Sequence, residues 1–175
     1  AVLNLEGIWT RYENPEQVLS EISKLDSKSA ISKLQEIYRA PIQPELIAHR
    51  IKQMRDSGIT GSLSPQHTVQ FAKTVVDAGV DIFVIRGTTV SAEHVSESGD
   101  ALNLKEFIYE LDVPVIVGGC ATYTTALHLM RTGAAGVLVG FGGGAAHTTA
   151  DVLGVQVSMA SAVADVAAAR RDYLD

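Results

Sequence analysis

Short apolar runs alternate along the chain with longer stretches in which apolar residues recur every three or four positions. The run at residues 82–85 is continuously apolar, which is typical of a strand covered by helices on both faces. The sequence therefore predicts short buried strands at residues 2–5, 59–63, 82–85, 115–117 and 136–139.

Helical periodicity fills the stretches between these runs. Gly58, Gly79 and Gly133 each follow a helical pattern directly before a predicted strand, where the left-handed conformation that stops a helix favours glycine. The predicted helices occupy residues 45–56, 68–78, 104–111, 124–132 and 160–173. Residues 13–40 are also helical and charged, but they contain no clear strand.

Strands that alternate with helices at this spacing predict βα units and a parallel sheet. The sheet is either open and doubly wound or part of a (β/α) barrel. Because a complete barrel typically needs about 250 residues, a barrel made by this 175-residue chain lacks some of its units. We expect one domain over residues 1–175, in which the helical segment 13–40 is the least defined part.

Composition narrows the classes of function. Hydrophobic residues make up 46% of the chain and charged residues 19%, so a packed core is expected rather than disorder. The net charge is −6, so the chain lacks the excess of positive charge that is typical of proteins that bind nucleic acid or an anionic membrane. A single cysteine excludes an internal disulfide and favours a reducing compartment. We therefore expect a cytoplasmic protein, whose chain opens on Ala1 without a recognisable leader.

A glycine-rich segment at residues 139–149, with the sequence VGFGGGAAHTT, follows the last predicted strand. Glycines let a backbone approach a ligand closely and turn its N–H groups or carbonyls inward. Residues 140–145 also fit the dinucleotide fingerprint in its G-x-G-x-x-A form, but the acidic residue expected about 20 positions later on a second strand is missing. A plain flexible loop at a strand end is the alternative interpretation.

The segment resembles the V-G-x-G-S-G-S-x-C-x-T loop of the IMP dehydrogenase / GMP reductase family, and the chain is most similar to the IMP dehydrogenase-related paralogues. The similarity continues through residues 151–154 and extends back to the predicted strands that begin near residues 2, 81 and 114. It implies a partial (β/α)8 barrel of the TIM type, with about strands two to six and parallel pairing. The family inserts a regulatory pair of CBS domains near the stretch that corresponds to residues 13–57, and no such insert is evident in this sequence.

The resemblance also implies a function and a site. The function is oxidation of a purine nucleotide with NAD (IMP to XMP, in guanine nucleotide synthesis) by a tetramer that uses a monovalent cation such as potassium. His147 and Thr149 match the catalytic positions, and the cofactor positions are Arg86, Gly87, Thr88, Gly140, Phe141 and Gly142. The substrate positions are Gly118, Gly119, Cys120 and Ala145, and the cation positions are Gly142, Gly144 and His147.

Three departures from the family pattern leave a second function open. His147 stands where the family has its nucleophilic cysteine, and a histidine is a poor substitute for a thiolate in forming a covalent adduct. Ala145 replaces a phosphate-binding serine, and Arg86 replaces an acid that helps to hold the dinucleotide. A noncatalytic nucleotide-binding or regulatory paralogue is therefore the alternative to the enzyme, and an open-sheet dinucleotide-binding module is a weaker third.

For the remaining histidines and the cysteine, a position in the core or on the surface is the alternative to a functional role. Cys120 follows a strand and is either a displaced nucleophile or a packing residue. His67 follows another strand and is expected at the start of a helix. His94 falls in residues 91–100, which are predicted to be a solvated polar loop, while His49 and His128 lie in predicted helices and are expected to be surface or packing residues.

Overall fold

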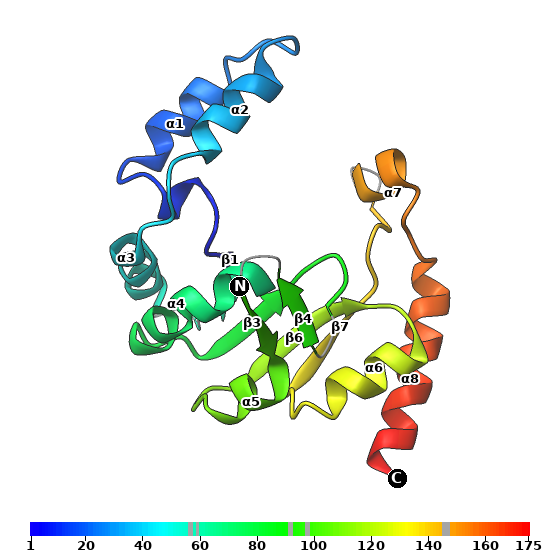
Figure 1. The fold of residues 1–175 in the computed structure, drawn as a ribbon. Helices are drawn as coiled ribbons and strands as arrows, with labels where there is room; N and C mark the ends of the chain where they lie inside the picture. Colours follow the sequence, from blue (N-terminus) through cyan, green and yellow to red (C-terminus); the bar gives the residue numbers. More distant parts are fainter. Residues whose placement is uncertain (56–57, 59, 91–92, 97–98, 145–147) are drawn as a thin grey trace. The chain divides into compact units, whose positions relative to one another are not determined.

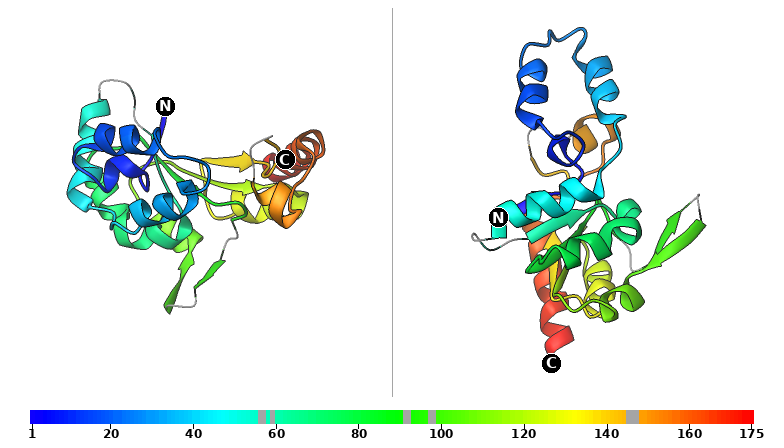
Figure 2. Two further views of the ribbon diagram at one scale, coloured as in Figure 1. Left: turned by 90° about the horizontal axis from the view of Figure 1, so that it is seen from above. Right: turned by 90° about the vertical axis from the view of Figure 1, so that its left-hand side faces the viewer.

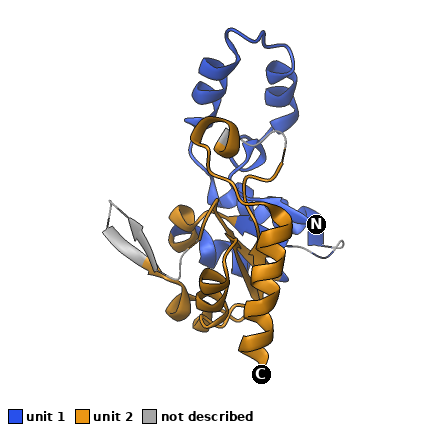
Figure 3. Cartoon of the chain, turned by 90° about the vertical axis from the view of Figure 1, so that its right-hand side faces the viewer, with its two compact units in different colours: residues 1–62, 70–81 blue, residues 63–69, 82–175 orange. Residues whose placement is uncertain are grey.

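The structure is a computed structural model that describes residues 1–55, 58, 60–90, 93–96, 99–144 and 148–175. Figure 1 and Figure 2 show its ribbon. The chain falls into two compact units, residues 1–62 with 70–81 and residues 63–69 with 82–175, which are coloured separately in Figure 3. The expectation of one domain over residues 1–175 stays a prediction.

The first unit pairs two parallel strands and adds several helices. β1 pairs in parallel with β2, and Leu3 lies opposite Gly61. The stretch 13–40 is helical, as expected, and the structure divides it into two helices, α1 and α2. The elements that contribute to this unit are β1 (Val2–Asn4), η1 (Ile8–Thr10), α1 (Pro15–Ile22), α2 (Ala30–Tyr38), α3 (Pro44–Met54), β2 (Thr60–Leu63) and α4 (Pro65–Asp77).

The second unit contains three mutually parallel strands, β3, β6 and β7. In the β3–β6 pair, Arg86 lies opposite Gly118, and in the β6–β7 pair Gly118 lies opposite Leu138. Its elements are β3 (Ile82–Arg86), β4 (Glu93–Ser96), β5 (Gly99–Asn103), α5 (Leu104–Tyr109), β6 (Val115–Cys120), α6 (Tyr123–Met130), β7 (Gly136–Val139), α7 (Thr148–Leu153) and α8 (Met159–Leu174). The predicted parallel strands are thus confirmed.

The core of the second unit is built on β3 and β6. Phe83 and Ile85 of β3 are fully buried, and the ring of Phe83 lies 6.2 Å from that of Phe107. Helices α6 and α8 pack side by side (Figure 1), and α8 contributes the small buried side chains of Ala162 and Ala169. The continuous apolar pattern of β3 is explained by this burial, because a strand in a covered parallel sheet meets apolar neighbours on both faces.

The expectation of a loop at residues 91–100 is wrong for its described part. β4 and β5 form an antiparallel pair in which Glu93 lies opposite Asn103 and His94 lies opposite Leu102. The two strands carry mainly polar residues and show no apolar alternation, so the pattern that identifies a half-buried strand is missing. The pairing depends on backbone hydrogen bonds, which leave no signal in the residue types.

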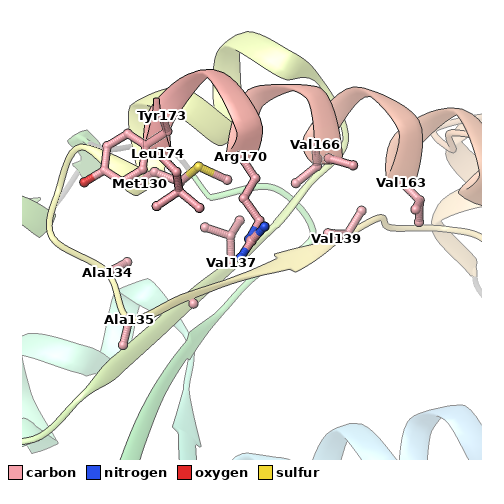
Figure 4. Close-up of a pocket in the computed structure, with 12 residues that line it drawn as sticks. Met130, Ala134, Ala135, Val137, Val139, Val163, Val166, Arg170, Tyr173 and Leu174 are labelled. Atoms are coloured by element: carbon pink, nitrogen blue, oxygen red, sulfur yellow. The ribbon is translucent and has the colours of Figure 1, made fainter.

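The edge strand β7 is half-buried along its length and borders an apolar groove. β7 pairs with β6, and it borders a groove of about 600 Å³ between itself and α8. Val137, Val163 and Val166 line this groove, and the side chain of Arg170 points into it toward Val137 (Figure 4). Among the described residues, no helix is long and apolar enough to cross a membrane.

We predict that Phe83→Ala lowers the free energy of unfolding by about 3–5 kcal/mol, because it removes a large aromatic ring from a fully buried position. Tyr109→Ala is the matched control: its side chain is 92% exposed, so we expect a change within about 0.5 kcal/mol. Urea denaturation measures both. Similar losses for the two variants would contradict this assignment of the core.

Candidate functional site

The carboxyl ends of β3 and β6 are joined by backbone hydrogen bonds beyond their regular pairing. The N–H of Gly87 donates to the carbonyl oxygen of Gly118 at 2.8 Å, and the N–H of Gly119 donates to that of Gly87 at 3.0 Å. The N–H of Val90 then donates to the Gly119 carbonyl at 3.1 Å. These contacts bring the loop after β3 onto the end of β6.

The loop after β7 reaches the same place. The N–H of Gly140 donates to the carbonyl oxygen of Cys120 at 2.6 Å. Arg86, the Gly118–Gly119 pair and the start of the glycine loop each lie at or just after the end of a strand, and the structure brings them together at one end of the sheet. We call residues 86–90, 118–121 and 140–144 the strand-end site.

Close packing requires the glycines at the end of β6. A Cβ at Gly118 would lie 2.5 Å from the Cβ of Leu138, and one at Gly119 would lie 2.5 Å from the Gly140 carbonyl oxygen and 3.2 Å from that of Thr88. No real Cβ tolerates the shorter distances, so the neighbouring backbones would have to move apart. The structure therefore shows a packing role for Gly118 and Gly119, and their contact with a substrate stays a prediction.

The glycine loop is covered by the connection between α7 and α8. Gly142 is buried with φ +69°, and a Cβ there would lie 2.7 Å from the carbonyl oxygen of Val155 and 3.0 Å from the Cβ of Gln156. The carbonyl of Thr149 accepts a hydrogen bond from the N–H of Val155 at 3.1 Å, which holds this connection to α7. Sequence reasoning missed these neighbours, because nothing in the residue types at 155 and 156 signals a contact with the loop.

Arg86 is the cation of the strand-end site. Its side chain is exposed, and the described residues offer it no hydrogen bond or ion pair. No Asp or Glu occurs at residues 86–90, 118–121 or 140–144. The described site thus presents an available guanidinium without a carboxylate, which fits an anionic group on a ligand and offers no acidic acceptor for sugar hydroxyls. Thr88 is exposed beside it, and Phe141 is half-buried.

Cys120 is buried, with 1% of its surface exposed. Burial raises the pKa of its thiol, so the protonated form dominates near neutral pH. Because the thiolate is the reactive form, this environment favours the packing interpretation over a displaced nucleophile.

The histidines are placed as follows. The Nδ1 of His67 lies 3.3 Å from the Oγ of Ser64, at the start of α4, and its side chain is half-buried. His49 on α3 and His128 on α6 are exposed, as expected for surface residues. No cluster of three or more His, Cys, Asp or Glu side chains that could hold a metal occurs in the part of the chain that the structure describes.

Some of the expected site residues cannot be placed. Ala145 and His147 lie outside the described residues, so the structure leaves the expected catalytic and substrate positions there untested. Of the expected cation set, Gly142 is buried and Gly144 is exposed, while the third member is His147. These assignments stay predictions.

Parallel strands whose following loops converge at their carboxyl ends define a class of α/β proteins that bind ligands at that edge. Residues 13–174 match the profile of the IMP dehydrogenase / GMP reductase domain. The chain therefore belongs to this family, and its fold is a partial (β/α)8 barrel.

Individual relatives agree with this family. The chain is 47% identical, over 99% of its length and 48% of theirs, to proteins of Mycolicibacterium smegmatis and Mycobacterium tuberculosis that are named uncharacterized oxidoreductases. It is 33% identical over 61% of its length to 21% of the inosine-5′-monophosphate dehydrogenase of Methanocaldococcus jannaschii. An IMP dehydrogenase/GMP reductase-like protein from Corynebacterium glutamicum is similar in structure, with 49% identity and a TM-score of 0.87 over 99% of this chain and 46% of that one. The chain thus spans about half the length of its closely similar relatives.

We predict that Gly142→Ala destabilises the protein and Gly143→Ala does not. At Gly142, the left-handed backbone costs an alanine about 1–2 kcal/mol, and the clash with the Val155 carbonyl adds to that cost. At Gly143, the nearest atom is the Cε of Met159 at 3.8 Å, an ordinary contact distance. Thermal melting of the two variants measures the difference, and equal midpoints would contradict the described loop.

We also predict that iodoacetamide alkylates Cys120 slowly in the folded protein. The raised pKa lowers the thiolate fraction, and burial blocks access. The rate should rise with pH and should increase many-fold in urea. Because Cys120 is the sole cysteine, intact-mass spectrometry reports its modification directly. Fast stoichiometric labelling of the folded protein at neutral pH would instead make this thiol a candidate nucleophile.

Proposed function

We propose that the chain supplies a nucleotide-binding part of an NAD-dependent oxidoreductase that acts on a purine nucleotide, as IMP dehydrogenase does. The observation that carries the proposal is the convergence of the loops after β3, β6 and β7, joined through Gly87, Gly119 and Gly140. The family membership of residues 13–174 supports it. By the same similarity, we propose a cytoplasmic homotetramer and a monovalent cation site that includes Gly142, Gly144 and His147.

The chemistry of the strand-end site assigns a role to Arg86. The described residues give the Arg86 guanidinium no partner, and such a group binds a phosphate through charge-assisted hydrogen bonds, so Arg86 would hold a phosphate of the substrate or the cofactor. Bound NAD supplies a hydride acceptor. The absence of an acidic residue at 86–90, 118–121 and 140–144 means that these segments offer no carboxylate to the ribose hydroxyls of a dinucleotide.

A noncatalytic nucleotide-binding paralogue is the second candidate. One observation favours it: Cys120 is buried with a raised pKa, while the sequence has His147 at the family's cysteine position. This chain thus offers no exposed thiol for a covalent adduct with the purine. In the enzyme, His147 and Thr149 would act at the reacting atoms, and Ala145 would lie beside the substrate. In the paralogue, the same positions would contact a ligand that is bound but not converted.

Calorimetric titration with IMP and with NAD, together with NADH absorbance, separates the two candidates. Binding with NADH formation that is lost in His147→Ala supports the enzyme, and binding without NADH formation supports the paralogue. The absence of IMP binding would contradict both.

We predict that Arg86→Gln weakens binding of the phosphorylated ligand by about tenfold to a hundredfold, since hydrogen bonds to charged groups contribute about 1.5–3 kcal/mol. Arg131→Gln is the matched control. It removes the same charge from an exposed arginine that follows α6 and precedes β7, away from the strand carboxyl ends. Calorimetry measures the affinity of each variant for IMP and for inosine. Because inosine lacks the phosphate, Arg86→Gln should leave its affinity unchanged. Equal weakening by the two arginine variants would show a general charge effect and contradict the assignment.

A further inference from the structure

Met159 is the first residue of α8 and lies against the glycine loop. A Cβ at Gly140 would lie 2.6 Å from the Cε of Met159 and 2.8 Å from its Sδ. A Cβ at Gly143 would lie 3.8 Å from the same Cε. The end of the Met159 side chain therefore occupies the space that a side chain at Gly140 would need, and it lies near the open side of Gly143.

Gly140 is held from two directions. Its N–H donates to the carbonyl of Cys120 at the end of β6, and the thioether of Met159 contacts its Cα side. Its φ of +88° is a conformation that side-chain-bearing residues rarely adopt, so the turn that starts the loop depends on this glycine. Of these two contacts, that with Met159 is made by a side chain, and that with Cys120 is made by the backbone.

Methionine suits such a contact because its unbranched, polarisable side chain adapts to irregular gaps. Met159 is 48% exposed, whereas α8 is anchored further along by the buried Ala162, Val166 and Ala169. Truncating Met159 should therefore free the loop without removing the packing that holds the helix. This separation makes a local effect on the loop distinguishable from a general loss of stability.

We propose that Met159 is a positioning residue of the strand-end site, whose thioether holds residues 140–144 in the conformation that receives the nucleotide. The effect on ligand binding rests on the proposed function, whereas the effect on the loop does not. Met159 acts through Gly140, and it need not touch the ligand itself.

The test compares Met159→Ala with Met159→Leu, which restores much of the apolar bulk, and with Val163→Ala, a half-exposed valine one turn further along α8. Amide hydrogen exchange of the peptide covering residues 139–144 is measured without ligand, and calorimetry measures the affinity for IMP. We expect Met159→Ala to speed exchange in this peptide alone and to weaken IMP binding about tenfold, equivalent to about 1.4 kcal/mol. Met159→Leu should recover most of both effects, and Val163→Ala should change neither.

Unchanged exchange in the 139–144 peptide of Met159→Ala would overturn the proposal. Faster exchange across the whole chain with a lower melting midpoint would also overturn it, because Met159 would then be a general structural residue. Faster exchange confined to the loop with unchanged IMP affinity would refute the role in binding. If the wild-type protein does not bind IMP, the proposed function fails, while the exchange experiment still decides whether Met159 positions the loop.

Discussion

The strand-end site depends on the close approach of three backbones at the end of β6. Gly118 and Gly119 lie so near to Leu138, Gly140 and Thr88 that any side chain would overlap its neighbours. Without a Cβ, the loops after β3 and β7 can donate hydrogen bonds to the carbonyls of β6. Strand register, the position of Arg86 and the start of the glycine loop all follow from this approach.

The same packing limits the chemistry of the site. Hydrogen bonds that join the loops use the N–H groups of Gly87, Gly119 and Gly140, so those groups are not available to bind a phosphate. The one thiol of the chain, that of Cys120 within the site, is buried, and burial raises its pKa so that it stays protonated near neutral pH. Arg86 is the charged side chain that the described part of the site presents to a ligand, and this favours anion binding.

The two faces of the glycine loop are stabilised by elements far apart in the sequence. β6 contributes backbone acceptors on one side, while Val155, Gln156 and Met159 fill the space on the other. Much of the glycine content is therefore explained by contacts within the chain. A ligand that binds at the loop meets a conformation that the protein itself has set.

Residue patterns alone determined the alternation of helices and parallel strands, because burial of β3 and β6 on both faces requires continuous apolar runs. The same patterns place Arg86, Gly118 and Gly140 at or just after the ends of predicted strands, and parallel strands end at one edge of a sheet. The polar hairpin β4–β5 was not predictable, because its pairing lies in the backbone. Only the tertiary structure decided that Gly118 and Gly119 are closely packed and that Cys120 is buried. Both depend on contacts between segments distant in sequence, such as Gly140 with Met159, for which the residue types carry no signal.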